Sequence, residues 1–222
     1  MKHIGLMFAL DAEMKNFSAN LQDLQRKILH KCTFYTGVVD NKIITAVISG
    51  MGKVNAALCA ADLINTFKVD LIINIGIAGG LDNSLKIGDF LVGKDIIYHD
   101  VWCGNPNKYG QIQGLPELYH STKELTAQIK KYPQGLICSG DYFVEKIEEL
   151  QKIKNNFPNS LAVDMESAAI AQTCHLYDVP FLVVRQISDI PGAENHAEQY
   201  ATFWQNAPKN SINMLQEILE IL

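Results

Sequence analysis

Hydrophobic residues along this chain fall into short runs, separated by longer segments with a helical repeat. Several of the runs are apolar at consecutive positions and rich in β-branched residues, which is typical of strands covered on both faces. The predicted strands cover residues 4–10, 31–39, 42–49, 69–76, 89–98, 135–140, 160–164 and 180–188. The pattern therefore indicates a sheet that is buried rather than one with a solvated face.

Helical periodicity is found between and after these runs. The predicted helices cover residues 54–67, 121–132, 145–156, 165–177 and 196–222, and Pro208 is placed to interrupt or kink the last of them. Strands that alternate with helices predict an α/β sandwich with a mostly parallel or mixed sheet. Within it, residues 31–39 and 42–48 should form a hairpin that turns at Asp40-Asn41.

Composition limits the class of protein. The length of 222 residues allows one or two domains, but no repeat, charge block or linker divides the chain, so a single domain over 1–222 is the simpler expectation. Hydrophobic residues make up 48% and charged residues 19%, which excludes general disorder. The formal charge of −5, from 19 basic and 24 acidic residues, argues against nucleic acid or an anionic membrane as a partner.

The five cysteines are odd in number and never spaced as CxxC, so reduced thiols are expected rather than a disulfide framework or a zinc site. The start, MKHIGLMFALDAEM, meets Asp11 and Glu13 where a signal peptide needs apolar length. No run approaches 18 apolar residues. These features predict a cytoplasmic protein that does not enter a membrane.

Two glycine-rich segments follow strands. SGMGK (49–53) lies between a strand and a helix, but it lacks the spacing of a P-loop and of a dinucleotide fingerprint. A tight turn explains its glycines as well as a ligand does. The glycines of NIGIAGG (74–80) carry no side chain, so another group can come close to this backbone. That group is either a ligand or another strand.

Carboxylates stand at several strand ends: Asp11 and Glu13, then Asp164 and Glu166, and finally Asp189. Each one alone is explained by helix capping or by a turn. Ligands of α/β sheets bind beyond the carboxyl ends of the strands, so these acids are also candidates for general acid–base chemistry if they converge. His99-Asp100 has no metal-ligand spacing and is more simply structural, and no GxSxG elbow supports acyl transfer.

The ordered segments GLMFALDAEM, SGMGKVNAA, NIGIAGGL, SGDYF, AVDMESAAIA and VPFLVVRQISD form a larger pattern. Through them the chain resembles the 5′-methylthioadenosine/S-adenosylhomocysteine nucleosidases of the nucleoside phosphorylase superfamily over nearly its full length. The resemblance implies a single-domain three-layer α/β sandwich with a central mixed sheet flanked by helices. It also implies hydrolysis of the bond between adenine and a 5′-thio-substituted ribose in methionine salvage. Such enzymes need no metal or cofactor, and they form homodimers whose pocket is completed across the interface.

The same resemblance assigns roles to individual residues. Asp189 matches the acid that protonates N7 of the purine, and Glu13 matches the base that deprotonates the attacking water. Glu166 and Met165 match the ribose-binding pair, Phe143 the stacking aromatic, and the main chain of Val144 the edge that reads adenine. The complete set of implied substrate-binding residues is Ile77, Ala78, Gly79, Phe143, Val144, Met165 and Glu166.

These roles suit the chemistry of an N-ribosidic bond. Its cleavage develops positive charge on the sugar and negative charge on the base, so a carboxylate near the ribose and a protonated acid at N7 both stabilise the transition state. Asp189 must therefore hold a proton near neutral pH. A phosphorylase would need arginines around phosphate. The chain has only Arg26 and Arg185, so hydrolysis is the better prediction.

Three departures from the family pattern leave alternatives open. Ile77 replaces an expected polar residue beside the catalytic acid, which would make the surroundings of Asp189 more apolar. Asp164 stands where the family usually has glutamate. The segment 101–116 is the most divergent, so the 5′ group is open, and Tyr200 aligns only loosely with a residue of that pocket. The alternatives are a hydrolase or phosphorylase of another purine nucleoside, such as a futalosine-type substrate, and a non-catalytic nucleotide-binding module.

Overall fold

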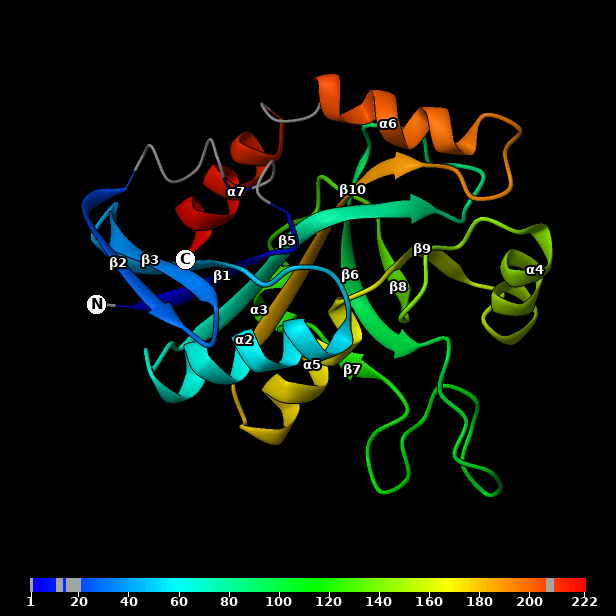
Figure 1. The fold of residues 1–222 in the computed structure, drawn as a ribbon, viewed down its shortest axis with the longest axis horizontal. Coiled ribbons are helices and arrows are strands. Elements are labelled where there is room, and N and C mark those ends of the chain that lie inside the picture. The colour runs from blue at the N-terminus through cyan, green and yellow to red at the C-terminus, as the bar shows by residue number, and fades with distance from the viewer. Residues whose placement is uncertain (1, 11–13, 15–20, 207–209) are drawn as a thin grey trace.

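A ten-stranded mixed sheet runs through the computed structural model, which describes residues 2–10, 14, 21–206 and 210–222 (Figure 1). Its strands are β1 (His3–Phe8), β2 (Gln22–Leu29), β3 (Cys32–Val39), β4 (Lys42–Ile48), β5 (Leu71–Gly80), β6 (Phe90–Tyr98), β7 (Tyr119–His120), β8 (Gln134–Ser139), β9 (Ser160–Asp164) and β10 (Phe181–Asp189). All eight strands expected from the sequence are present.

The strand order is β10-β6-β8-β9-β5-β1-β4-β3-β2, and β10 also pairs with β5. Strands β5, β10, β6, β8 and β9 therefore close into a ring. The pairs β1–β4, β1–β5, β10–β5, β6–β8 and β8–β9 are parallel, whereas β10–β6, β5–β9 and the hairpin β3–β4 are antiparallel. The prediction of a mixed sheet is confirmed.

Helices cover both faces of this sheet (Figure 1). They are α2 (Lys53–Asn65), α3 (Lys123–Thr126), α4 (Ile147–Asn156), α5 (Ser167–Leu176), α6 (His196–Asn206) and α7 (Asn210–Ile221). One core cluster joins α2 and α5 to the sheet, for example through Leu63 and Ile170 against Ile72. A second cluster joins α7 to the other face, with Ile218 and Ile73 among its members. The three-layer sandwich predicted from the sequence is confirmed.

The local sequence pattern predicted most strands, because a strand that is buried on both faces needs a continuous run of apolar residues. Every residue of β10 is buried, and so are five of the six residues of β1. The hairpin of β3 and β4 turns at Asp40 and Asn41, whose φ angles of 47° and 59° suit the two-residue turn that Asp and Asn favour.

Two sequence predictions were wrong in detail. Strand β2 was not expected, because five of the eight residues of QDLQRKIL are polar and every position except the last is exposed. Only its pairing with β3 at the sheet edge makes it a strand. The helix predicted over 121–132 shrinks to α3. The side chain of Gln134 donates hydrogen bonds to the carbonyls of Thr126 and Ile129. A longer helix would have needed the Thr126 carbonyl as the acceptor for the N–H of Lys130.

Residues 196–222 form two helices, α6 and α7, with Pro208 in the undescribed residues between them. Asp11 and Glu13 likewise lie outside the described residues. In the described ranges, no helix combines the length and the apolar character that a membrane span requires. That one domain covers the whole range 1–222 stays a prediction.

Candidate active site

A cavity opens where the carboxyl ends of β5, β9 and β10 meet. Strands β5 and β9 pair antiparallel only through Gly79 and Gly80 with Val163 and Ala162, so their two carboxyl ends run into each other. Beside them, Asp189 of β10 pairs with Gly79. A Cβ at Gly79 would stand 2.8 Å from the Pro191 ring and 3.2 Å from Oδ2 of Asp189, so only glycine leaves space for this approach.

The cavity brings together most of the residues predicted from the sequence. The cavity has a volume of about 90 Å³, which is room for several water molecules. The predicted site residues that line it are Ile77, Ala78, Gly79, Phe143, Val144, Met165, Glu166 and Asp189. Glu13 falls outside the described residues. Strands far apart in the chain thus deliver eight of the nine predicted residues to one place.

Asp189 is buried and hydrogen-bonded through both carboxyl oxygens. It is 2% exposed, and its Oδ1 accepts a hydrogen bond from the hydroxyl of Ser188. Its Oδ2 lies 2.6 Å from Nε2 of His196, at the start of α6. Ser188 and His196 thus give this acid polar contacts, and the effect of Ile77 on it stays a prediction.

Glu166 is held by the glycine turn that follows β4. The N–H of Gly52 donates a hydrogen bond of 2.8 Å to Oε1 of Glu166, and the next N–H, from Lys53, donates one of 2.8 Å to Oδ1 of Asp141. Gly52 adopts a φ of 93°, which favours glycine and aims this N–H at the carboxylate. The SGMGK segment thus serves as a turn that positions Glu166.

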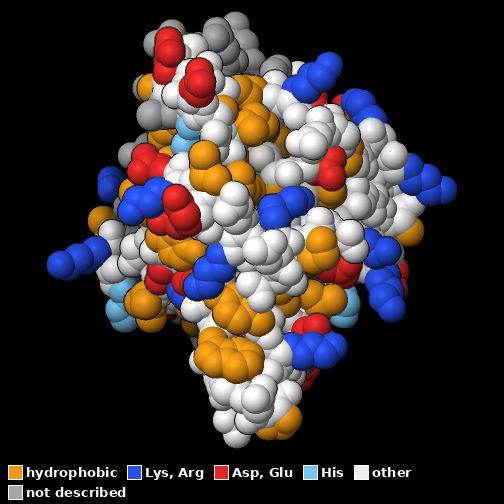
Figure 2. All heavy atoms as spheres, turned by 90° about the vertical axis from the view of Figure 1, so that its right-hand side faces the viewer, with side chains coloured by type: hydrophobic (Ala, Val, Ile, Leu, Met, Phe, Trp, Pro, Cys, Tyr) orange, Lys and Arg blue, Asp and Glu red, His pale blue; other side chains and the backbone are white. Residues whose placement is uncertain are grey.

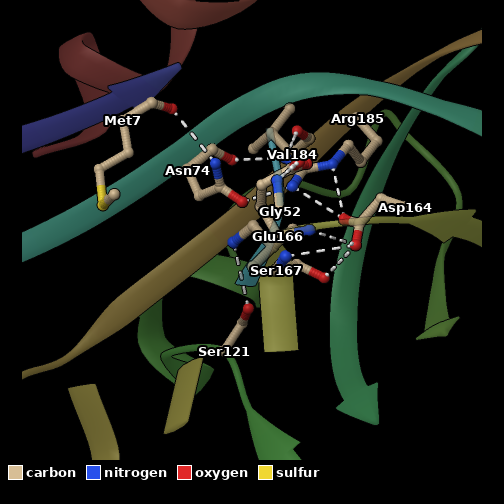
Figure 3. A network of polar contacts seen from close by, with 10 residues as sticks. Met7, Gly52, Asn74, Ser121, Asp164, Glu166, Ser167, Val184 and Arg185 are labelled. Carbon is tan, nitrogen blue, oxygen red and sulfur yellow. Dashed lines mark hydrogen bonds and ion pairs between the residues drawn. The ribbon is translucent and has the colours of Figure 1, made fainter. Parts of the chain in front are cut away.

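A buried ion pair lies in the wall of the cavity, and Figure 3 shows its polar contacts. Arg185 of β10 is 1% exposed and pairs with Oδ2 of Asp164 at 2.8 Å. Its other N–H groups donate to the main-chain and side-chain oxygens of Asn74 in β5. The second oxygen of Asp164 accepts from the N–H and hydroxyl of Ser167 at the start of α5. Asp164 therefore caps a helix, as its sequence position allowed, and also neutralises a buried cation.

Sequence reasoning missed the roles of Asn74, Ser188 and His196, and it noted Arg185 only as one of two arginines. An arginine inside the apolar strand FLVVRQISD was a usable signal, because a buried guanidinium requires partners. His196 gave no comparable signal, since a histidine at a helix start is ordinary. Tyr200, which aligned only loosely, does line the cavity and meets the Phe143 ring edge-on at 5.3 Å.

His99 and Asp100 do not line the cavity. His99 is 1% exposed with its ring against Tyr142, and burial lowers the pKa of its imidazole. Burial opposes the charge on Asp100, but a hydrogen bond from Lys53 and one from the N–H of Asp141 outweigh it and lower the pKa of this carboxyl. The structural interpretation of this pair fits its position.

No group of three His, Cys, Asp or Glu side chains in the described part of the chain is arranged to hold a metal ion. Lys and Arg side chains are also scarce around the cavity: of the described lining residues only Arg185 carries a positive charge, and Asp164 neutralises it. What the cavity offers a ligand is an aromatic ring, main-chain groups and carboxyl groups.

Comparison with known proteins agrees with this arrangement. The family model of the Phosphorylase superfamily matches residues 3–220. The 5′-methylthioadenosine/S-adenosylhomocysteine nucleosidase of Staphylococcus aureus is 39% identical, and the match covers 99% of this chain and 100% of that protein. The chain belongs to the 5′-methylthioadenosine/S-adenosylhomocysteine nucleosidase family.

Solved structures of this nucleosidase family share the fold. The S-adenosylhomocysteine nucleosidase of Streptococcus pyogenes in complex with 5-methylthiotubericidin superposes with a TM-score of 0.94 at 36% identity, covering 100% of this chain and 97% of that one. The family member from Colwellia psychrerythraea in complex with adenine gives 0.92 at 34% identity, over 99% and 95% of the two chains. The family resemblance seen in the sequence is confirmed.

Proposed function

We propose that this protein hydrolyses the N-ribosidic bond of 5′-methylthioadenosine and S-adenosylhomocysteine and releases adenine. The observation that carries the proposal is the meeting of Asp189, Glu166 and Phe143 in one cavity at the carboxyl end of the sheet. Together these groups offer a proton for a leaving base, a negative charge for a sugar and a flat surface for a purine. The names of the related enzymes support the same reaction.

The base end of the proposed site is formed by Phe143, Val144 and Asp189. The Phe143 ring is 41% exposed and lines the cavity, so a purine can stack on it. The main chain of Val144 reads the edge of adenine, and Asp189 donates its proton to N7. That proton neutralises the charge that develops on the base as the bond to the sugar breaks, which makes adenine a better leaving group.

The sugar end is formed by Glu166 and Met165, beside Ile77, Ala78 and Gly79 of β5. The Gly52 N–H fixes one oxygen of Glu166, which orients the carboxylate toward the ribose hydroxyls. Its negative charge stabilises the positive charge that develops on the sugar ring. Glu13 takes the proton of the attacking water in this scheme, as the family pattern implies.

Water is favoured over phosphate as the nucleophile. A phosphate site needs cations or unused main-chain N–H groups. Here the N–H groups of Gly52 and Lys53 already donate to carboxylates, and Arg185 is closed in its pair with Asp164. An added anion would meet Glu166 and Asp189 instead. We therefore propose a hydrolase and not a phosphorylase.

Chromatography of the products from a small panel of nucleosides tests this proposal. With methylthioadenosine and S-adenosylhomocysteine we expect free adenine and the free 5′-thio-substituted ribose, at rates that inorganic phosphate does not raise. A sugar 1-phosphate would instead identify a phosphorylase. Release of a base only from a different nucleoside, such as a futalosine-type substrate, would reassign the substrate. Intact nucleosides that stay bound after long incubation would identify a binding module.

We further propose a cytoplasmic homodimer in which the partner subunit completes the pocket. The support is a set of exposed hydrophobic side chains. Met51 lines the cavity. The full set is Met51, Val54, Leu58 and Trp102, each more than half exposed, at 58%, 69%, 56% and 55%. Val54 and Leu58 are one helical turn apart on α2. The segment after β6, which contains Trp102, lies on the same side of the molecule as α2 (Figure 1). Figure 2 shows exposed hydrophobic side chains (orange) toward the bottom of its view of the molecule. Such patches mark interfaces.

Substituting Leu58 by Glu should weaken this dimer, because the change places a charge in an apolar interface. We expect light scattering to give the mass of a dimer for the unaltered protein and of a monomer for Leu58→Glu, with a loss of adenine release. The matched control is Ile28→Glu, since Ile28 is 61% exposed on the edge strand β2 and does not belong to this group of four side chains. A monomeric unaltered protein that is fully active would contradict the prediction.

A further inference from the structure

The side chain of His196 contacts two residues of the proposed base site, Asp189 and Phe143. Its Nε2 atom lies 2.6 Å from Oδ2 of Asp189, and the two side chains are 7% and 2% exposed. His196 is the first residue of α6 and Asp189 is the last of β10, so the contact spans seven residues and ties the helix to the strand end. A hydrogen bond this short between two buried side chains is a strong one.

The same imidazole also packs on the ring that is proposed to stack on adenine. The His196 and Phe143 rings are 5.1 Å apart at an interplanar angle of 15°, which is a stacked pair. Tyr200, one turn further along α6, meets the Phe143 ring edge-on. One side chain thus touches both the proposed acid and the proposed aromatic platform.

The proposed reaction uses up the proton of Asp189 in every turnover. After N7 has taken this proton, a carboxylate remains, and it must be protonated again before the next substrate can react. An imidazolium at 2.6 Å can supply a proton to this carboxylate directly, with no water molecule between the two groups. Histidine is the side chain that gains and loses a proton near neutral pH.

We propose that His196 is a positioning residue that supplies the proton which Asp189 delivers to the base. This inference rests on the proposed function. The N–H bond of the His196 imidazolium breaks as an O–H bond forms on Asp189. That O–H bond then breaks as an N–H bond forms at N7, and the electron pair of the ribosidic bond leaves with the base. The neutral imidazole regains a proton from water. Its stacking on Phe143 keeps the acid and the platform in register.

Other titratable groups surround this pair. On its own segment His196 is flanked by Glu194 and Glu198. Across the cavity the charged and titratable lining residues are Tyr142, Asp164, Glu166, Arg185 and Tyr200. The charges of Arg185 and Asp164 cancel, so the negative charge of Glu166 is the main one that faces the pair from other elements.

The test compares two substitutions, each with the pH dependence of kcat and KM for adenine release. In His196→Gln the side-chain amide keeps a donor for Asp189 but cannot carry a proton. In His196→Phe the ring keeps its stacking on Phe143 but loses the hydrogen bond. We expect kcat to fall by about 10-fold or more in both, less than the loss expected for the acid itself, with KM changed little. The kcat maximum should move to lower pH, since Asp189 must then take its proton from water.

Several outcomes would overturn the inference. His196→Gln with unchanged kcat and an unchanged pH profile would show that His196 is only structural. A lower KM with unchanged kcat would show that the imidazole competes with the base for Phe143. No adenine release by the unaltered protein would instead refute the proposed function. If neither variant folds, the ring ¹⁵N signals of the histidines decide: one should shift its titration in Asp189→Asn, and no shift would refute the contact.

Discussion

Turnover by Asp189→Asn should fall by about 10²-fold or more while the protein stays folded, which is the usual scale for the loss of a general acid. Asparagine has the shape of aspartate and can still accept from the Ser188 hydroxyl, so the end of β10 keeps that contact. The amide cannot release a proton to N7, however, and adenine would have to leave as an anion. Steady-state kinetics with methylthioadenosine, together with a thermal unfolding curve, measures both parts.

A matched substitution separates the loss of an acid from a general effect of the same chemical change. Asp40→Asn is suitable because Asp40 is exposed in the β3–β4 hairpin and has a φ of 47°, a conformation that Asn adopts readily. We expect its kcat to equal that of the unaltered protein. Near-normal activity of Asp189→Asn would show that another group protonates the base.

Asp164→Asn should destabilise the fold by about 3–5 kcal/mol, the usual cost of removing one partner of a buried ion pair. The amide can still accept from the N–H of Ser167, so the helix cap survives, but Arg185 is left as a buried cation without its counter-charge. The guanidinium is 1% exposed, so water cannot replace the carboxylate. Urea unfolding at one fixed protein concentration measures the effect.

A double-mutant cycle tells the ion pair apart from other effects at the same position. Arg185→Met alone should also destabilise, because Asp164 and Asn74 then lose their donor. The double variant with Arg185→Met and Asp164→Asn should lose less stability than the sum of the two single variants, since it contains neither of the two charges. A strictly additive double variant, or a loss below about 1 kcal/mol for Asp164→Asn, would contradict a stabilising role of the pair.

Local sequence patterns predicted the interior strands well and the periphery less well. Strands such as β10 are buried on both faces, so their apolar runs are unambiguous. Strand β2 is exposed and mostly polar, and only its neighbour β3 makes it a strand. The helix predicted over 121–132 has helical propensity along its length, but contacts from Gln134 end it early. Tertiary contacts overrode local preference in both cases.

The candidate site divides in the same way. Eight of the residues on the cavity wall were named from short motifs, because strand ends in an α/β sheet converge and family motifs lie at those ends. The assignment of roles to Glu13, Asp189 and the other residues remains a proposal that the kinetic variants test. The hydrogen-bond partners that hold the polar groups of this wall could not be named from the sequence. No spacing rule links Arg185 to Asn74, which are 111 residues apart, or Gly52 to Glu166, which are 114 apart.

By itself, the sequence determined the class of fold, the order of most strands and helices, and which carboxylates stand at strand ends. These features depend on the periodicity of neighbouring side chains, which is a local property. Only the tertiary structure decided which groups surround those carboxylates: Ser188 and His196 at Asp189, the Gly52 N–H at Glu166, and Arg185 at Asp164. The physical reason is that a buried polar group takes its partners from whatever the packed fold brings within about 3 Å, regardless of distance along the chain.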